Sequence, residues 1–202
     1  MSDAGLVHII DDDASLRAAL DSLFRSVGRE TRQYASVAEF LAAKLPDVPG
    51  CLILDVRLPG LSGLDFQAQF AELGIRLPAV LMTGHGDIPM TVRAMKAGAV
   101  DFLTKPFRDQ DMLDAVSTAI GRDQARRQQE AGNDRLKALY ATLTTREKQV
   151  MALVCAGKMN KQVAGDLGLS EITVKIHRGT LMRKMGARTL ADLVRLAEAL
   201  AM

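Results

Sequence analysis

Polar residues follow four strand-like apolar runs in the first half of the chain, at the point where each run ends. These residues are Asp11, Asp12, Asp55, Thr83 and Lys105. In an open parallel α/β sheet, ligands bind beyond the carboxyl ends of the strands. We therefore expect the five side chains to converge on one point, although they are far apart in the sequence.

The residue types at these positions suggest phosphoryl transfer. Three neighbouring carboxylates repel one another and raise each other's pKa unless a cation lies among them. A hard divalent ion with oxygen ligands, Mg²⁺, suits such a set. One carboxylate can then attack a phosphoryl group, while the metal, a Lys and a hydroxyl neutralise charge on its oxygens. Our candidate nucleophile is Asp55, because it stands alone on a central strand.

Simpler interpretations exist for these acids. Asp12 or Asp13 could simply be the cap of the helix that follows, with no role in a site. A metal-dependent phosphatase with an aspartyl nucleophile would use similar acids. Such enzymes usually carry the motif Asp-x-Asp after a strand. Here Arg57 stands two positions after Asp55. Several polar residues at consecutive strand ends are harder to explain as unrelated turn or cap residues.

The first half of the chain alternates strand and helix five times. Helices are predicted over residues 14–27, 36–44, 62–73, 87–97 and 109–120. Ser36 and Ser62, each followed three residues later by an acid, are typical first residues of helices. Such alternation predicts right-handed crossovers and a doubly wound, five-stranded parallel sheet of the flavodoxin-like kind.

Residues 1–121 resemble the receiver domain of two-component response regulators. The motifs that carry the resemblance are Asp11-Asp12, Asp55 with Leu58-Pro59-Gly60 and Gly63, Thr83-Gly84-His85-Gly86-Asp87, Ala97-Gly98-Ala99 and Lys105-Pro106-Phe107. The stretches 82–90 and 94–107 look most like the FixJ branch of that family. The resemblance implies a domain that accepts a phosphoryl group and is not otherwise an enzyme, although it catalyses its own phosphoryl uptake and hydrolysis.

The resemblance also implies roles for single residues. Asp55 accepts phosphate from a histidine kinase, with Thr83 and Lys105 beside it. Asp12, Asp55 and the backbone carbonyl of Arg57 hold Mg²⁺ directly, and Asp11 holds it more remotely.

Other implied roles concern switching. Thr83 and Phe102 form the switch pair, and the Lys105-Pro106 peptide bond is cis. Switching is expected on the face of the fourth helix, fifth strand and fifth helix. Residues expected on this face are Val92, Met95 and Lys96. A two-fold dimer through it would bring two DNA-binding units onto half-sites about one helical turn apart.

Composition predicts a soluble protein of two domains. The chain has 202 residues, of which 48% are apolar, and no apolar run approaches the length that spans a bilayer. No basic start precedes the first apolar run, so we expect no signal peptide. Cys51 and Cys155 lack metal-ligand spacing and fit buried positions in a reducing compartment. We expect a cytoplasmic protein without a membrane partner.

Charge divides the chain into two parts. Residues 1–121 carry 11 Lys and Arg against 16 Asp and Glu, whereas residues 122–202 carry 15 against 8. An acidic first part and a basic second part indicate that the second part meets a polyanion.

The second part begins with a linker and ends in four predicted helices. Residues 122–141 have almost no apolar face and are predicted to be partly helical, as an extension of the fifth helix that breaks at Gly132-Asn133. A small all-α domain is predicted over residues 142–202. Its helix start and stop residues are Thr144 with Glu147, Gly157, Asn160, Gly168, Ser170, Met185, and Thr189 with Asp192.

The short helix, tight turn and longer basic helix of this tail are typical of a helix-turn-helix. Residues 143–200 resemble the LuxR-type DNA-binding domain, through Leu143-Thr144-x-Arg146-Glu147, Asn160-Lys161 and the run from Ser170 to Arg178. By this resemblance Lys175, Ile176 and Gly179 face the groove, and Asn160, Lys161 and Thr173 lie nearer phosphates.

Helical spacing divides the residues of the longer helix between its two faces. One face carries Val174, Arg178, Leu181 and Met185, and most of that stripe is predicted to be core. The opposite face, expected to enter the major groove, carries Ile172, Lys175, Ile176, Gly179 and Arg183. His177 fits a packed position better than one that reads bases. Lys184 and Arg188 are predicted to be solvated cations with some attraction for phosphate.

Taken together, the sequence predicts a transcription regulator that a histidine kinase phosphorylates at Asp55. Phosphorylation would promote dimerisation and binding to promoter DNA, where RNA polymerase is a further partner. The alternative for the tail is a protein-binding or RNA-binding helical bundle.

Overall fold

The computed structural model describes residues 5–200, so both ends of the chain lie outside the described residues. The chain divides into two compact units, residues 1–127 and 128–202. The division falls within the segment 122–141 that the sequence predicts as a linker. We call these two parts the first unit and the second unit.

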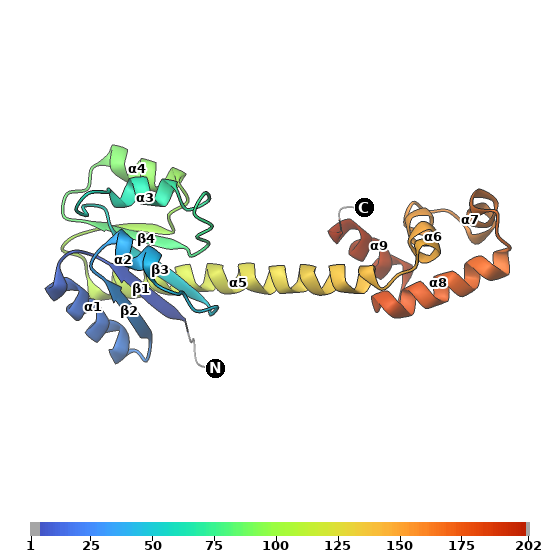
Figure 1. Ribbon diagram of the computed structural model, residues 1–202, viewed down its shortest axis with the longest axis horizontal. Coiled ribbons are helices and arrows are strands. Elements are labelled where there is room, and N and C mark those ends of the chain that lie inside the picture. The colour runs from blue at the N-terminus through green and yellow to red at the C-terminus, as the bar shows by residue number, and fades with distance from the viewer. Residues whose placement is uncertain (1–4, 201–202) are drawn as a thin grey trace. The chain divides into compact units, whose positions relative to one another are not determined.

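The first unit is built on one parallel sheet (Figure 1). Its strands are β1 (Leu6–Ile10), β2 (Glu30–Tyr34), β3 (Gly50–Asp55), β4 (Ala79–Thr83) and β5 (Asp101–Thr104). Their order in the sheet is β2-β1-β3-β4-β5, so the winding direction reverses between β1 and β3. Ligands in doubly wound sheets bind at this reversal. The predicted fold class is confirmed for this unit.

Helices cover both faces of the sheet. They are α1 (Ala14–Ser26), α2 (Val37–Ala42), α3 (Gly63–Ala68), α4 (Ile88–Lys96) and α5 (Asp109–Ala141). α1 and the first part of α5 pack on one face, and α2, α3 and α4 pack on the other (Figure 1). Because successive strand residues point to opposite faces, Ile53 enters one core, whereas Leu52 and Leu54 enter the other.

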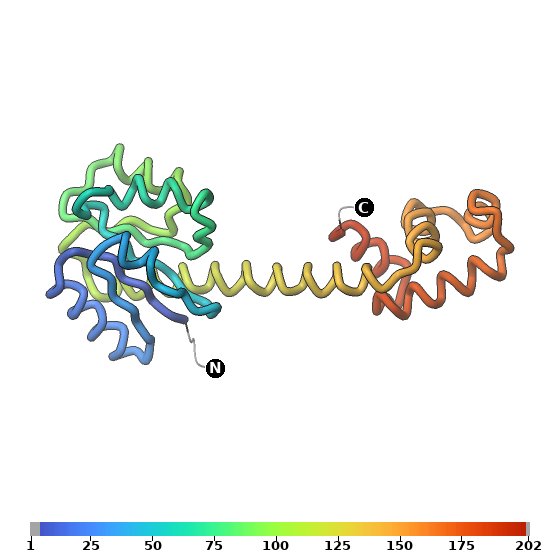
Figure 2. The backbone as a smooth tube through the Cα atoms, viewed as in Figure 1, coloured from blue at the N-terminus to red at the C-terminus, as the bar shows by residue number. Residues whose placement is uncertain are grey.

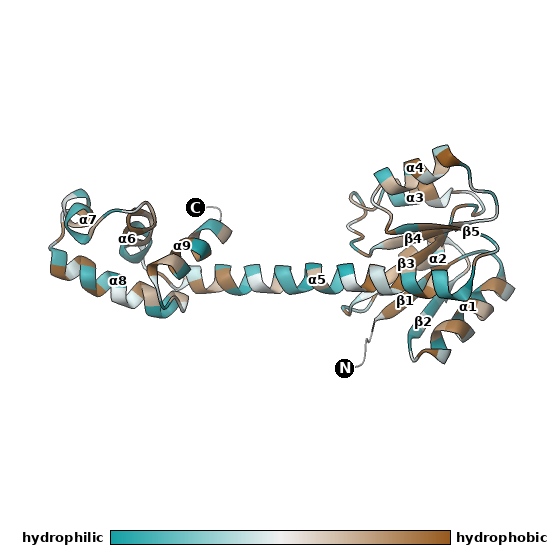
Figure 3. Cartoon of the chain, turned by 180° about the vertical axis from the view of Figure 1, so that it is seen from behind, coloured by the Kyte–Doolittle hydropathy of each residue, from teal (hydrophilic) through white to brown (hydrophobic). Residues whose placement is uncertain are grey.

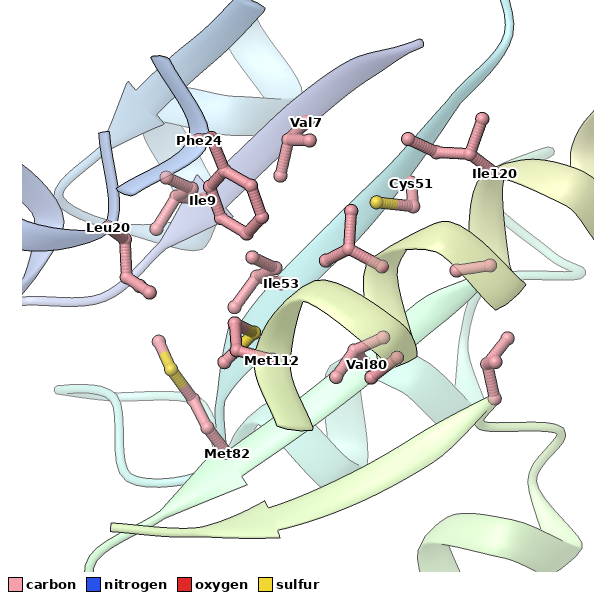
Figure 4. Packing of buried hydrophobic residues seen from close by; sticks show 14 residues of the cluster. Val7, Ile9, Leu20, Phe24, Cys51, Ile53, Val80, Met82, Met112 and Ile120 are labelled. Carbon is pink, nitrogen blue, oxygen red and sulfur yellow. The ribbon is translucent and has the colours of Figure 1, made fainter. Parts of the chain in front are cut away.

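The core between the sheet, α1 and α5 is closely packed (Figure 4). Phe24 of α1 and Met112 of α5 meet Ile9 and Ile53 of the strands there. Cys51 is buried in the same cluster, and burial raises the pKa of its thiol to about 12. The buried position predicted for Cys51 is therefore confirmed.

The predicted helix starts of the first unit are confirmed. The side chains of Ser36 and Ser62 accept backbone hydrogen bonds at the starts of α2 and α3. Asp13, one of the two acids considered, caps α1. The ends of α2 and α3 come earlier than predicted, at Ala42 and Ala68. α3 stops because the next amides bond three residues back, which closes a tighter turn.

The predicted break in the linker is wrong. α5 is one helix of 33 residues and runs without interruption through Gly132 to Ala141. Figure 3 shows how polar its middle is compared with β3 and β4. A single Gly in a helix costs only about 1 kcal/mol relative to Ala, and the surrounding Gln, Glu, Arg and Ala residues favour helix. Among residues 5–200, no helix combines the length and the low charge needed to cross a bilayer.

An ion-pair cluster attaches α5 to the sheet of the first unit. The carboxylate of Asp123 is fully buried and accepts hydrogen bonds from the Gly50 amide at 3.1 Å, from Arg127 Nε at 2.8 Å and from Arg126. Burial alone would raise the pKa of Asp123, but these donors outweigh it and hold the pKa below its usual value. The sequence placed Asp123 in a solvated linker and missed this contact.

The second unit contains the helix-turn-helix (Figure 2). Its helices after α5 are α6 (Thr145–Cys155), α7 (Asn160–Leu167), α8 (Glu171–Met185) and α9 (Leu190–Ala199). The caps predicted at Thr144, Ser170 and Thr189 are confirmed, as is the left-handed Gly168 that ends α7. Asn160 is not a cap: it is the first residue of α7, and Gln162 bonds back to the Met159 amide instead.

One histidine is enclosed in the first unit. His8 of β1 is buried, its Nδ1 lies 3.1 Å from the Tyr34 hydroxyl, and its ring stacks on Tyr34 with a centroid distance of 5.9 Å. Burial, and to a lesser extent the positive charge of the nearby Arg32, together lower the pKa of His8 to about 4. The folded protein therefore holds His8 neutral at physiological pH.

We expect the first unit to lose stability as pH falls from 6.5 to about 4. In this window the unfolded chain binds a proton at His8 and the folded chain does not, so the free energy of unfolding decreases. The loss amounts to up to about 3 kcal/mol. Urea unfolding followed by circular dichroism at several pH values, for wild type and His8→Phe, measures it. An equal pH dependence in both proteins would contradict this assignment.

Candidate functional site

Two buried carboxylates and one ammonium group form the centre of the site. Asp11 follows β1 and is fully buried, and Asp55 ends β3 with 5% of its surface exposed. Lys105 Nζ lies 2.7 Å from Asp11 Oδ2 and 3.1 Å from Asp55 Oδ2. The predicted convergence of the ends of β1, β3 and β5 is therefore confirmed for these three side chains.

Burial and neighbouring groups shift the pKa values of Asp55 and Lys105. Burial raises the pKa of Asp55, and the hydrogen bond from Lys105 offsets only part of that rise. For Lys105, burial alone would lower the pKa, but its hydrogen bonds to Asp11 and Asp55 outweigh burial and raise it. Lys105 therefore stays charged, and its positive charge makes the neighbouring carboxylates tolerable in a buried position.

Asp12 completes a set of oxygen ligands for a metal ion. One carboxylate oxygen each from Asp11, Asp12 and Asp55 lies within 4.8 Å of the others. Asp12 is exposed, whereas Asp11 is buried and its Oδ1 accepts a hydrogen bond from the Asp13 amide at 2.8 Å. An all-oxygen set open to solvent on one side fits Mg²⁺, which keeps several of its waters. The Arg57 amide lies 3.3 Å from Asp55 Oδ1, and the metal contact of its carbonyl stays a prediction.

Thr83 ends β4 and is fully buried beside this centre. Its hydroxyl lies 3.3 Å from both the amide and the carbonyl of His85, and its carbonyl accepts from the Lys105 amide at 2.7 Å. The ends of β4 and β5 are thereby tied together. The Lys105-Pro106 bond is cis, as predicted.

Two glycines allow other groups to pack closely around the site, because a side chain at either position would collide with its neighbours. The sequence did not reveal this requirement. A side chain at Gly63 would begin 2.2 Å from the Asp55 carbonyl oxygen, so α3 could not start so close to β3. A Cβ at Gly86 would lie 2.7 Å from Thr104 Cγ2 and 3.1 Å from the half-buried Phe102 ring. Both glycines stand in the motifs quoted above, but only the packing explains them.

α4 presents apolar side chains to solvent. Val92 and Met95 are each 45% exposed, as expected for a contact face, and Lys96 is exposed as well. Ile88 is 81% exposed and precedes Val92 by one helical turn. Ile88 was not among the residues predicted on this face, although it precedes Val92 and Met95 by four and seven residues, a spacing that places all three on one side of a helix.

In the second unit, α8 separates a core stripe from an exposed face. Val174, Leu181 and Met185 are buried, as predicted. The residues predicted to face a groove, together with Arg183, are all exposed: Lys175, Ile176, Gly179 and Arg183. Their contacts with a ligand stay predictions.

The three residues predicted nearer phosphates differ in how many hydrogen bonds they make within the protein. Lys161 is exposed. Asn160 Oδ1 accepts a hydrogen bond from Arg178 at 3.2 Å, which links α7 to α8, and the Thr173 hydroxyl lies 2.8 Å from that of Ser170. Two of the three side chains therefore also stabilise the helix-turn-helix itself.

The prediction that Lys184 is a solvated cation is wrong. Its Nζ lies 2.7 Å from Glu147 Oε2 and 3.1 Å from the Thr142 carbonyl. Glu147 is buried and also accepts from the Thr144 amide at 2.8 Å, and the hydrogen bond from Lys184 lowers the pKa of Glu147. Lys184 thus joins α8 to the start of α6. No local pattern signals a pair separated by 37 residues.

Two known families match the two units. Residues 7–117 match the family described as the response regulator receiver domain. Residues 141–197 match the family described as bacterial regulatory proteins, luxR family. The second match favours DNA binding over an RNA-binding or protein-binding bundle.

Similar proteins carry both units over nearly their whole length. Nodulation protein W of Bradyrhizobium diazoefficiens is 58% identical over 98% of this chain and 88% of its own. The response regulator protein TodT of Pseudomonas putida is 47% identical over 99% and 88%. Among solved structures, response regulator StyR superimposes with a TM-score of 0.86 at 47% identity, covering 96% of this chain and 98% of its own. Full-length FixJ from B. japonicum gives 0.59 at 38%, covering 98% of each.

Gly179 allows a test of the exposed face of α8. Apart from the neighbouring residues of α8 itself, nothing lies within 4 Å of a Cβ built at Gly179, so Ala fits there. Gly179→Ala should stabilise α8 by about 1 kcal/mol and so raise the thermal midpoint of the second unit. Gly179→Leu starts from the same open, exposed Cβ position, but its longer side chain should hinder close approach of DNA. Thermal unfolding and gel-shift titration measure the two effects. Unchanged DNA affinity for Gly179→Leu would mean that this face does not meet DNA.

Proposed function

The chain belongs to the two-component response regulators that join a receiver domain to a LuxR-type DNA-binding domain, and we propose that Asp55 is its phosphate acceptor. The observation that carries this proposal is the position of Asp55. It ends the central strand β3, it is almost buried, and its Oδ2 lies 3.1 Å from the Lys105 ammonium. Asp11 is more deeply enclosed and Asp12 is exposed, so neither has both the protection and the access of Asp55.

The proposed reaction is transfer of a phosphoryl group from a histidine of a partner kinase. An Asp55 oxygen forms the new O–P bond while the P–N bond to the kinase imidazole breaks, and the electron pair stays with that nitrogen. Lys105 is close enough to neutralise a phosphoryl oxygen, and the Thr83 hydroxyl can donate to another. Hydrolysis of the acyl phosphate by water later restores Asp55. In this proposal the receiver domain catalyses its own phosphorylation and dephosphorylation, and the protein acts on transcription, not on a further substrate.

We further propose that Mg²⁺ is held by Asp11, Asp12, Asp55 and the backbone carbonyl of Arg57. The cluster of three carboxylate oxygens supports this ligand set. When bound, the ion supplies positive charge to the phosphoryl oxygens. Asp11 and Asp12 bring the negative charge that attracts the ion, and Lys105 remains available to the phosphoryl group.

Phosphorylation is proposed to act through Thr83 and Phe102. A phosphoryl group on Asp55 would draw the Thr83 hydroxyl toward it, away from its contacts with His85. The space at Gly86 lets the Phe102 ring lie near Thr83, so displacement of Thr83 changes the room that Phe102 has. Phe102 belongs to β5, next to α4, so the change reaches the outer face of that helix.

The proposed consequence is a homodimer that binds promoter DNA. The exposed stripe of α4, made by Ile88, Val92 and Met95 with Lys96 beside it, is the proposed dimer face. Two helix-turn-helix units would then occupy two half-sites, with α8 of each in the major groove. At a promoter the dimer would meet RNA polymerase, and the proposed place of action is the cytoplasm.

Replacing the acceptor tests the proposed chemistry. Asp55→Asn should abolish phosphorylation by acetyl phosphate with Mg²⁺, because an amide neither attacks phosphorus nor contributes charge to the metal site. Asp114→Asn removes an exposed carboxylate of α5 and serves as the matched control. Intact-protein mass spectrometry detects the added phosphoryl group, and chelation of Mg²⁺ should suppress it in wild type. Normal phosphorylation of Asp55→Asn would refute the assignment.

A charge on the α4 stripe tests the dimer face. Met95→Asp should take up phosphate normally but remain monomeric, because the face then places like charges opposite each other. DNA affinity of the phosphorylated protein should fall at least ten-fold, as expected when two half-sites are no longer bound together. Leu41→Asp, at an exposed apolar position of α2, is the control. Light scattering and gel shifts provide the readouts, and a dimeric Met95→Asp phosphoprotein would exclude this face.

A further inference from the structure

The exposed face of α8 carries two isoleucines that have no role in the fold. Ile172 is 74% exposed and Ile176 is 63% exposed. They are four residues apart, so they lie on the same face of the helix one turn from each other. A single exposed apolar residue is common in folded proteins and has no meaning by itself. β-branched residues also weaken a helix relative to Ala, so this pair gives α8 no stability in the free protein.

The surroundings of the pair fit a nucleic acid better than a protein surface. Glu171 is the only acidic residue of α8, and it stands in the first turn, where an acid favours the helix. Lys175, between the two isoleucines in sequence, is exposed, and a Cβ at Gly179 would have nothing within 4 Å. An apolar pair beside an exposed cation and an open backbone position matches a groove that is lined by phosphates and also offers apolar groups.

In the major groove, the apolar group that distinguishes a base is the C5-methyl of thymine. We propose that Ile172 and Ile176 contact thymine methyl groups, so that each half-site contains two thymines beside the base or phosphate that Lys175 contacts. Four helical residues rise about 6 Å, and successive bases rise about 3.4 Å along the helix axis, so the two thymines lie within two base steps of each other. This inference rests on the proposed DNA binding by α8 and specifies what α8 reads.

The test begins with full-length protein treated with acetyl phosphate and a library of random DNA duplexes. Bound duplexes are enriched and sequenced, and the common thymines are then replaced one at a time by deoxyuridine. Deoxyuridine keeps every hydrogen-bonding group of thymine and lacks only the methyl. Affinities of the thymine and deoxyuridine duplexes are compared by fluorescence anisotropy.

Wild type should bind a deoxyuridine duplex about four-fold more weakly for each contacted methyl, which corresponds to about 0.8 kcal/mol. The double variant Ile172→Ser, Ile176→Ser should bind thymine and deoxyuridine duplexes equally. Serine has about the same helix propensity as isoleucine, so α8 keeps its stability in this variant. Leu41→Ser, which changes an exposed apolar residue of α2 instead, should keep the wild-type difference.

Three results would overturn the inference, each in a recognisable way. Equal binding of thymine and deoxyuridine duplexes by wild type would exclude methyl contacts while leaving DNA binding by α8 intact. A serine variant that still distinguishes the duplexes would show that residues other than Ile172 and Ile176 read the methyls. If wild type retains DNA but enriches no sequence, the isoleucines read no base; if it retains no DNA at all, the proposed DNA binding fails as well.

Discussion

Two buried carboxylates that share one ammonium group impose the strictest constraint on the first unit. Asp11 and Asp55 sit at the ends of adjacent strands, and burying them unpaired would be strongly unfavourable. Lys105 reaches both because β5 pairs with β4 and because its amide bonds to the Thr83 carbonyl. The strand order of the sheet, the glycine beside Asp55 and the position of Thr83 all serve this arrangement.

The same requirement, that a buried carboxylate be paired with donors, explains two other long-range contacts. Asp123 is buried on α5 and takes its donors from two arginines and a strand amide, whereas Glu147 is buried at the start of α6 and takes Lys184 from α8. In each case a carboxylate removed from water is matched by cations and backbone amides, which favours its charged form. These pairs stabilise the framework, whereas Lys175 of α8 is exposed.

Local sequence signals predicted the elements well wherever the interaction that forms them is local. The caps of α1, α6 and α8 follow from single side chains that bond to amides two or three residues away. The break expected at Gly132 failed because one Gly does not outweigh a surrounding sequence of good helix formers. The cap expected at Asn160 failed because Gln162 satisfies the helix start, while Arg178 takes the Asn160 side chain.

The approach of Asp11, Asp55 and Lys105 could be predicted from the sequence alone, because each follows a strand of an alternating strand–helix series and parallel strands end at one edge of a sheet. The sequence also determined the core stripe of α8, because helical spacing assigns residues to faces. The ion pair between Lys184 and Glu147, the burial of Asp123 against Gly50 and the room made by Gly63 and Gly86 become visible only in the folded chain. These contacts join residues far apart in the chain, through helix crossings and close backbone approaches, and no local pattern of residue types encodes the distance between two packed elements.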